Sequence, residues 1–145
     1  MTQPLVILLV EDNPADVLLT REALEDSSIC LDLRVAVDGA GALAELRRNS
    51  VDDELPDLVL LDVQLPGMSG HDVLRSIKGD DALGSLPVVM LSSSRADDDV
   101  RRSYEAHANC YVAKPAGLDD YLDVVHSIED FWLATVRLPP RAAAR

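Results

Sequence analysis

The segment LVILLVEDNPAD, residues 5–16, decides how this chain folds. Leu5–Val10 is an unbroken run of Leu, Val and Ile, which is typical of a strand buried on both faces of a sheet. Glu11 and Asp12 end the run, and the Asn-Pro pair that follows supplies a helix N-cap and a first-turn proline. A buried strand that passes directly into a helix predicts a parallel sheet.

The same pattern recurs along the rest of the chain. Further strands are predicted over residues 31–37, 58–61, 87–91 and 110–113, and helices over about 40–48, from near His71, after an acidic cap at Asp97–Asp99, and over about 118–136. Five strand-then-helix units with short connections indicate a doubly wound α/β fold, a parallel sheet with helices on both faces. Ligands of such sheets bind at the carboxyl ends of the strands.

Those strand ends carry a chemically coherent set of side chains. Glu11 and Asp12 follow the first strand, Asp62 the third, Ser92 the fourth and Lys114 the fifth. Neighbouring carboxylates repel one another unless a cation lies between them, and oxygen ligands without His or Cys favour Mg²⁺. A hydroxyl and an ammonium beside them suit a phosphoryl group. The residues therefore predict Mg²⁺-assisted phosphoryl transfer with a carboxylate nucleophile.

Composition narrows the class of protein. The 145 residues fit one domain, because about 150 residues is the usual size of a domain. The net charge of −13 disfavours nucleic acid and anionic lipid as partners. Leu5–Val10 is the longest apolar run and is far shorter than the roughly 20 residues of a membrane span. Cys30 and Cys110 have no metal-site spacing and are interpreted as reduced thiols of a cytoplasmic protein.

Four motifs in order resemble the receiver domain of two-component response regulators. They are VEDNPAD at 10–16, LVLLDVQLPGMSG at 58–70, PVVMLSS at 87–93 and YVAKP at 111–115. The resemblance implies a flavodoxin-like sheet of five strands in the order 2-1-3-4-5, with the receiver domain over 4–136 and a C-terminal tail over 137–145. Since the tail is too short to fold, we expect a stand-alone receiver, and we interpret the tail as disordered.

The resemblance also implies the roles of the acidic residues. Asp62 would be the phosphoacceptor, which takes a phosphoryl group from the phosphohistidine of a sensor histidine kinase. Asp12, Asp62 and the backbone carbonyl of Gln64 would bind Mg²⁺, and Glu11 would act on the ion through water. An acyl phosphate is reactive enough to store free energy and later hydrolyse, so the chain would be a self-resetting switch that catalyses only its own phosphorylation and dephosphorylation.

Two further residues would hold the phosphoryl group, and one would transmit the signal. Lys114 would contact Asp62 and the phosphoryl oxygens, and Ser92 would move to donate a hydrogen bond to them. Tyr111 matches the aromatic switch position, which turns inward when Ser92 moves. Each residue also has a plain structural interpretation: Asp62 as a helix cap, Ser92 as a strand-end hydroxyl and Tyr111 as half-buried packing.

The last helix carries an apolar stripe suited to packing on the sheet. The stripe comprises Leu118, Leu122, Val125, Ile128 and Trp132, and Tyr121, Val124 and Phe131 widen it beyond one core face. The ending IEDFWL…RLPP, together with VEDNPADVLLTREAL at 10–24, resembles small receivers paired with bacterial phytochrome histidine kinases. This resemblance implies a light-responsive kinase upstream and a homodimer with Phe131 and Trp132 at its interface. Ordinary closure of the core also accounts for the two aromatic residues.

Two enzymatic alternatives fit parts of the sequence. Gly39–Ala44 matches the GxGxxG/A pattern of dinucleotide-binding enzymes, but it follows the second strand and leaves the carboxylates unexplained. A Mg²⁺-dependent phosphatase with an aspartyl nucleophile would want an Asp two residues after Asp62, where Gln64 stands. His71, His107 and His126 lie on different elements, so surface or packing roles are expected for them.

Overall fold

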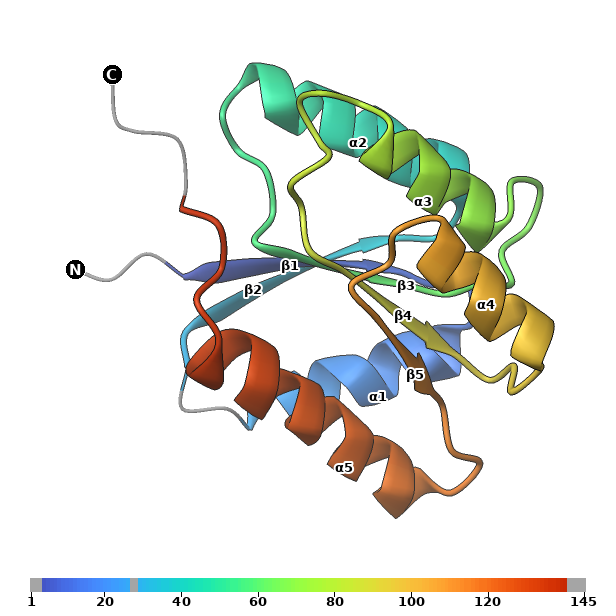
Figure 1. Cartoon of the computed structure of the whole chain (residues 1–145). Coiled ribbons are helices and arrows are strands. Elements are labelled where there is room, and N and C mark those ends of the chain that lie inside the picture. The colour runs from blue at the N-terminus through green and yellow to red at the C-terminus, as the bar shows by residue number, and fades with distance from the viewer. Residues whose placement is uncertain (1–3, 27–28, 141–145) are drawn as a thin grey trace.

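The computed structural model describes residues 4–26 and 29–140. Five parallel strands form one sheet in the order β2-β1-β3-β4-β5 (Figure 1). They are β1 (Leu5–Val10), β2 (Leu31–Ala36), β3 (Leu58–Leu61), β4 (Val88–Ser92) and β5 (Cys110–Ala113). The doubly wound fold and the strand order predicted from the sequence are therefore confirmed.

Helices cover both faces of the sheet. They are α1 (Pro14–Glu25), α2 (Gly39–Val51), α3 (Gly70–Lys78), α4 (Asp97–Glu105) and α5 (Leu118–Glu129), and α5 continues into a π-helical segment, η1 (Asp130–Thr135). In Figure 1, α1 and α5 lie below the sheet, whereas α2 and α3 lie above it. Among the described residues, no helix is both long enough and apolar enough to cross a membrane.

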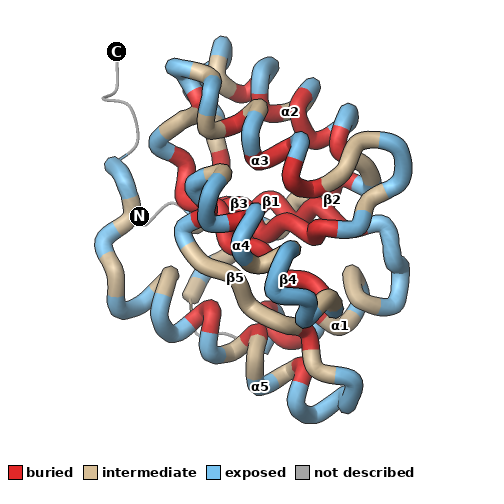
Figure 2. The backbone as a smooth tube through the Cα atoms, turned by 45° about the vertical axis from the view of Figure 1, so that its right-hand side comes forward, coloured by how far each residue is buried: buried red, intermediate tan, exposed pale blue. Residues whose placement is uncertain are grey.

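Side chains of the strands alternate between two hydrophobic clusters. Leu8 and Val10 of β1 pack under α2 and α3, and Ile7 and Leu9 pack against α1 and α5. All four are at most 2% exposed, and Figure 2 shows β1 within the buried centre of the molecule, whereas the edge strand β5 is intermediate. Burial on both faces explains why β1 is apolar at every position rather than at alternate ones.

The register of the strands brings their carboxyl ends to one edge. Val10 of β1 is level with Leu61 of β3, and Ser92 of β4 is level with Ala113 of β5. The residue that follows each of these strand ends therefore emerges at the same edge of the sheet. This is the edge at which the sequence predicted the site.

The last helix differs from its prediction at both ends. Leu118 was assigned to the face that packs on the sheet, but it is the first residue of α5 and is 56% exposed. Tyr121 was placed outside the core face, but it is only 4% exposed and its hydroxyl is 2.9 Å from Thr20 Oγ1. The α-helical hydrogen bonds end at Glu129 rather than near Val136, and a π-helical turn replaces them.

Other differences concern helix ends. Asn13 caps α1 as predicted, since its Oδ1 accepts a hydrogen bond from Ala15 N–H at 2.9 Å. Asp97–Asp99 were expected to precede and cap α4, but they form its first turn, and Ala96 occupies the N-cap position. The carboxylates still stabilise α4, because they lie near the positive end of its dipole.

The tail was interpreted as disordered, but its first part lies against the domain. Pro139 and Pro140 line a pocket of about 100 Å³ together with Leu55, Pro56 and Pro87, which precede β3 and β4. Residues 141–145 lie outside the described part of the chain. The segment up to Pro140 thus packs at the amino-terminal edge of the sheet, opposite the carboxyl ends of the strands.

Candidate functional site

Glu11 and Asp12 enter the site from the end of β1. Glu11 is fixed by its backbone, whose N–H donates to the Ala36 carbonyl at 3.0 Å. Its carboxylate is buried, with 2% of the residue exposed, and accepts a hydrogen bond from Asn13 N–H at 3.2 Å. Asp12 is exposed. The pair therefore offers one buried and one solvent-facing carboxylate at the same strand end.

Asp62 enters from the end of β3. Its backbone N–H donates to the Val10 carbonyl at 3.1 Å, and its Oδ1 accepts a hydrogen bond from Gln64 N–H at 3.1 Å. Gly70 at the start of α3 packs directly beneath it, because a Cβ there would lie 2.0 Å from the Asp62 carbonyl oxygen. The close approach explains the second glycine of the PGMSG segment. Ser69 caps α3, so the interpretation of Asp62 as a helix cap is wrong.

Lys114 contacts three carboxylates of the site through its ammonium. Its backbone N–H donates to the Ser92 carbonyl at 2.7 Å, which places the side chain at the end of β5. Its ammonium donates to Glu11, to Asp16 Oδ2 at 3.0 Å and to Asp62 Oδ2 at 3.1 Å. Only 6% of the Lys114 side chain is exposed, so three carboxylates neutralise one nearly buried cation.

Asp16 was not predicted as a site residue. It lies in the first turn of α1, where an acidic residue already has a local explanation in the helix dipole. The available signal was its spacing, because Asp16 is four residues after Asp12 and the first turn of α1 begins beside the strand end.

Burial and charge shift the pKa values of two of these groups. Burial raises the pKa of Glu11 to about 7, the Lys114 ammonium opposes the rise, and the Asp62 carboxylate adds to it. Burial alone would lower the pKa of Lys114, but the carboxylates of Glu11, Asp62 and Asp16 outweigh burial and hold that pKa above its ordinary value. Lys114 is therefore a permanent cation, whereas Glu11 changes charge near neutral pH.

The acidic cluster has the donor set of a divalent cation site. Glu11, Asp12 and Asp62 each offer a carboxylate oxygen, and these oxygens lie within 4.8 Å of one another. Two of the three residues are buried, where uncompensated negative charge is costly. Oxygen ligands of this kind suit a hard cation. The residues present therefore fit a divalent metal ion, beside an ammonium that neutralises part of their charge.

Ser92 and Tyr111 are joined through the loop that follows β4. Ser92 is fully buried, and its Oγ accepts a hydrogen bond from Ser94 N–H at 3.3 Å. The Tyr111 hydroxyl donates to the Ser94 carbonyl at 2.7 Å, and its half-buried ring packs against the cluster under α3. A movement of the loop at Ser92 would therefore also move Tyr111.

The predicted histidine roles hold for His71, which packs between helices. It is 2% exposed, and its Nε2 lies 3.1 Å from the Asp99 carbonyl and 3.0 Å from Ser103 Oγ. These contacts tie α3 to α4. Ser94 Oγ donates to the Asp99 carboxylate, so the same helix pair is also linked to the loop after β4.

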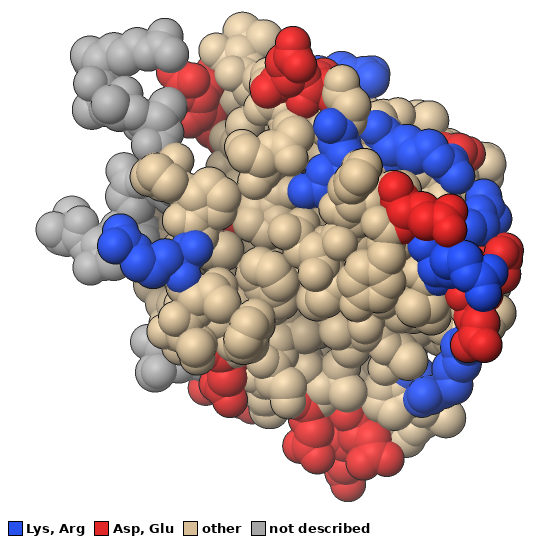
Figure 3. Space-filling view, in the orientation of Figure 1, with Lys and Arg blue, Asp and Glu red and all other residues tan. Residues whose placement is uncertain are grey.

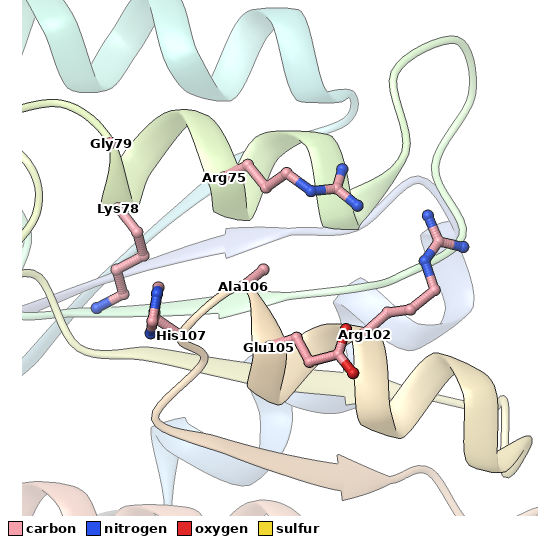
Figure 4. Close-up of a pocket in the computed structure, with 7 residues that line it drawn as sticks. All are labelled: Arg75, Lys78, Gly79, Arg102, Glu105, Ala106 and His107. Atoms are coloured by element: carbon pink, nitrogen blue, oxygen red, sulfur yellow. The ribbon is translucent and has the colours of Figure 1, made fainter.

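A basic groove lies apart from the acidic cluster. It has a volume of about 570 Å³, and Figure 4 shows α3 supplying Arg75 and Lys78 and α4 supplying Arg102 and Glu105. Figure 3 shows Lys and Arg gathered on the side of the molecule where α3 and α4 lie. The Lys78 ammonium donates to the Leu86 carbonyl at 2.7 Å, so it serves at least partly to tie α3 to the start of β4.

Phe131 and Trp132 form an aromatic pair in η1, directly after α5. Their ring centroids are 5.6 Å apart in an edge-to-face arrangement. Phe131 is 53% exposed, whereas Trp132 packs partly against the core. Both line an apolar groove of about 320 Å³ with Val112 and Ile128. Cys110, in the same groove, and Cys30 are free thiols.

Known proteins resemble this chain over nearly its whole length. The family model of the response regulator receiver domain matches residues 7–126. The response regulator Rcp1 of Synechocystis sp. is 45% identical over 138 residues, which cover 94% of each chain. The crystal structure of the phosphorylated cyanobacterial phytochrome response regulator RcpA has a TM-score of 0.91 at 43% identity, covering 95% of this chain and 100% of that one.

A second solved structure, the Mn²⁺-bound form of Rcp1, has a TM-score of 0.89 at 45% identity and covers 94% of this chain and 100% of that one. The match to the family model runs from within β1 into α5 and includes the acidic cluster and Lys114. The fold, the residues at the strand ends and the comparisons agree: the chain belongs to the response regulator receiver domain family and is a signalling module of that kind.

Proposed function

We propose that the chain is a switch that accepts a phosphoryl group on Asp62. The observation that carries this proposal is the position of the Asp62 carboxylate, which lies 3.1 Å from the Lys114 ammonium and within the acidic cluster at the sheet edge. A carboxylate so placed can act as a nucleophile, while neighbouring cations neutralise the charge of an incoming phosphoryl group.

The donor in this proposal is the phosphohistidine of a sensor histidine kinase. An oxygen of Asp62 bonds to phosphorus as the phosphorus–nitrogen bond breaks, and the imidazole, already protonated on its other ring nitrogen, leaves as neutral histidine. Lys114 and the hydroxyl of Ser92 then hold the phosphoryl oxygens, as a point charge and a neutral donor respectively. Water later hydrolyses the acyl phosphate and returns Asp62 to its carboxylate form.

The metal of this reaction is proposed to be Mg²⁺. Asp12, Asp62 and the Gln64 backbone carbonyl would bind it, and Glu11 would act through water. When bound, Mg²⁺ neutralises charge on the transferring phosphoryl oxygens. The nature of the donors supports this choice, because Mg²⁺ prefers carboxylate and carbonyl oxygens and usually keeps several waters.

Lowering the pH through 7 is expected to weaken Mg²⁺ binding. Because the pKa of Glu11 is raised to about 7, its carboxyl gains a proton below that pH and loses its negative charge. The affinity for Mg²⁺, measured by titration calorimetry, should be about tenfold lower at about pH 6 than at about pH 8. Glu11→Gln has no carboxyl to titrate and should show a much flatter profile. A wild-type profile as flat as that of Glu11→Gln would contradict the prediction.

Signal output is proposed to pass through Ser92 and Tyr111. A phosphoryl group adds negative charge and three acceptor oxygens at Asp62, which draws the Ser92 hydroxyl away from Ser94 N–H. The loop that follows β4 then moves, and Tyr111 moves with it because its hydroxyl is bonded to the Ser94 carbonyl. The surface around Tyr111 would thereby differ between the two states and be read by protein contacts.

The upstream kinase is proposed to be of the phytochrome type. Rcp1 and RcpA support this choice, since RcpA is a phytochrome response regulator and the two resemble the chain over 94% and 95% of its length. The chain would act in the cytoplasm, where ATP supplies the phosphohistidine of such kinases. Transfer of phosphate to Asp62 from a purified phytochrome kinase, compared with a kinase of another class, tests this assignment.

The central experiment follows the mass of the wild-type chain with Mg²⁺ and a small phosphoryl donor. A switch gains a single phosphoryl group that is lost in base, and peptide mapping should place it on Asp62. Release of product over many turnovers, or cleavage of added dinucleotide, would instead favour an enzyme. Absence of any label on a chain that binds Mg²⁺ would overturn the proposed function.

A homodimer through α5 is proposed as the assembled form. The groove around Phe131 is apolar, and Figure 3 shows an area without charged side chains over β5 and between α4 and α5. Aromatic side chains of this kind are frequent anchors at the centres of interfaces. A second copy that presents the same surface would cover the exposed ring of Phe131.

Phe131→Ala combined with Trp132→Ala is expected to weaken self-association by at least about tenfold, because removing aromatic anchors typically costs 2 kcal/mol or more. Sedimentation at several concentrations measures the effect. Phe131→Ala alone retains the half-buried indole and controls for loss of folding. Val51→Ala, at an apolar side chain that is 84% exposed on α2, should leave association unchanged. Sedimentation of the double variant identical to wild type would contradict the dimer.

A further inference from the structure

Lys114 has three N–H bonds, and three carboxylates accept them. Glu11 and Asp62 are two of these acceptors, and both also belong to the acidic cluster that fits a metal. Asp16 is the third acceptor, at 3.0 Å, and it reaches the ammonium from α1 rather than from a strand end. In this arrangement no donor of Lys114 is left over for a phosphoryl oxygen.

Exposure distinguishes Asp16 from the other two acceptors. The side chains of Glu11 and Asp62 are 2% and 10% exposed, whereas that of Asp16 is 24% exposed. A buried carboxylate that loses its ammonium partner cannot bind water in its place, so the loss is strongly destabilising. A partly exposed carboxylate can replace the same partner with water. Asp16 is therefore the acceptor that Lys114 gives up most readily.

Local contacts hold Asp16 in position. Asn13 Oδ1 accepts a hydrogen bond from Asp16 N–H at 3.4 Å, and Thr20 Oγ1 donates to the Asp16 carbonyl at 2.8 Å. Since the Thr20 hydroxyl has one proton, the Tyr121 hydroxyl must be the donor of the 2.9 Å bond between them. The first turn of α1 is thereby fixed to α5 by a buried contact, and the carboxylate of Asp16 is directed at Lys114.

We propose that Asp16 is a positioning residue which holds the third N–H bond of Lys114 in the unphosphorylated chain and releases it to the phosphoryl group. This inference rests on the proposed function of Asp62. Asp16 then competes with the phosphoryl oxygens for the same donor, so it lowers the affinity of the site for a phosphoryl group and helps the switch to reset. When Lys114 moves to the phosphoryl group, water replaces the ammonium as the partner of the Asp16 carboxylate.

Replacement of Asp16 is expected to tighten the binding of beryllium trifluoride, a phosphoryl analogue, in the presence of Mg²⁺. Asp16→Ala removes both the charge and the acceptor, and its affinity should rise about three- to tenfold over wild type. Asp16→Asn retains an oxygen acceptor without the charge, so its affinity should lie between the two. Titration followed by the ¹⁹F signal of the bound fluoride measures these values.

Affinity for Mg²⁺ alone separates positioning from a general effect of charge. Asp120→Asn is the matched control, because Asp120 is an exposed acidic residue in the first turn of α5, as Asp16 is in the first turn of α1. The Asp16 variants should change Mg²⁺ affinity no more than Asp120→Asn does, while only they tighten beryllium trifluoride binding. Melting temperatures close to wild type would show that all variants are folded.

Three results would overturn the inference. Asp16→Ala could bind beryllium trifluoride no more tightly than wild type, or Asp120→Asn could tighten binding as much, which would assign the effect to net charge. In either case wild-type binding leaves the proposed function of Asp62 intact. If a folded wild-type chain that binds Mg²⁺ fails to bind beryllium trifluoride at all, the proposed function falls and the role of Asp16 falls with it.

Discussion

Asp62→Asn is expected to take up no phosphoryl group under conditions in which the wild-type chain takes up one. The amide has the size and shape of the carboxylate, and its oxygen can still accept the hydrogen bond from Gln64 N–H. It lacks the negative charge and the nucleophilic oxygen that an acyl phosphate requires. The mass of the intact protein after incubation with Mg²⁺ and a small phosphoryl donor measures the loss directly.

Asp12→Asn is the matched comparison for this experiment. It also removes one carboxylate from the acidic cluster, but it leaves Asp62 available as the nucleophile. Weaker metal binding should slow labelling by about ten- to a hundredfold without abolishing it, a range typical for loss of a group that supports a metal site. Labelling of Asp62→Asn to the same extent as wild type, at whatever residue, would show that the phosphoacceptor lies elsewhere.

Lys114→Met is expected to lower the free energy of unfolding by about 3–5 kcal/mol at about pH 8 without metal. The methionine retains much of the stem but leaves Glu11 and Asp62 without the ammonium that neutralises them. In the wild-type chain at this pH the Glu11 carboxyl, with its pKa near 7, is mostly ionised and paired with the ammonium. In the variant nothing opposes the rise that burial causes, so Glu11 must either stay charged without its partner or take up a proton, and both lower the stability. Denaturant unfolding followed by circular dichroism measures the change, and added Mg²⁺ should recover part of it.

Lys78→Met provides the control for Lys114→Met. Lys78 is also a partly buried lysine, but its ammonium donates to the Leu86 carbonyl and to Asn109 Oδ1 at 2.7 and 3.2 Å. Its loss should cost about 1 kcal/mol, as for a typical hydrogen-bonded group. If both variants lose the same stability, the carboxylates of the cluster do not depend on Lys114 for their neutralisation.

The strands were predictable because the relevant signals are local, whereas their order followed from the resemblance to receiver domains. Leu5–Val10 is apolar without interruption and ends at an acidic pair, and the same kind of boundary recurs at Asp62 and Lys114. Once each strand is recognised, the parallel sheet brings their ends together without any further information. For this reason Glu11, Asp12, Asp62 and Lys114 could be assigned to one site from the sequence.

Contacts between polar side chains far apart in the sequence were the part that the sequence did not reveal. Asp16 and Lys114 are separated by 98 positions, and the local role of Asp16 in a helix first turn conceals its contact with the ammonium. Tyr121 was expected to widen the apolar stripe beyond the core face, but it is buried and its hydroxyl forms a hydrogen bond with Thr20, 101 positions away. Periodicity indicates which helix face is apolar, but it does not identify the partner of a buried polar atom.

The end of the described chain has a practical consequence for optical sensing. Pro139 and Pro140 lie at the amino-terminal edge of the sheet, and β1 starts at that edge with Leu5, so the described chain begins and ends at the edge opposite the carboxyl ends of the strands. A chain tethered to a surface through a C-terminal tag would therefore present its acidic edge to the solution. Kinase could reach the immobilised chain unhindered, and a fluorescent fusion partner at that terminus would report the switch without crowding it.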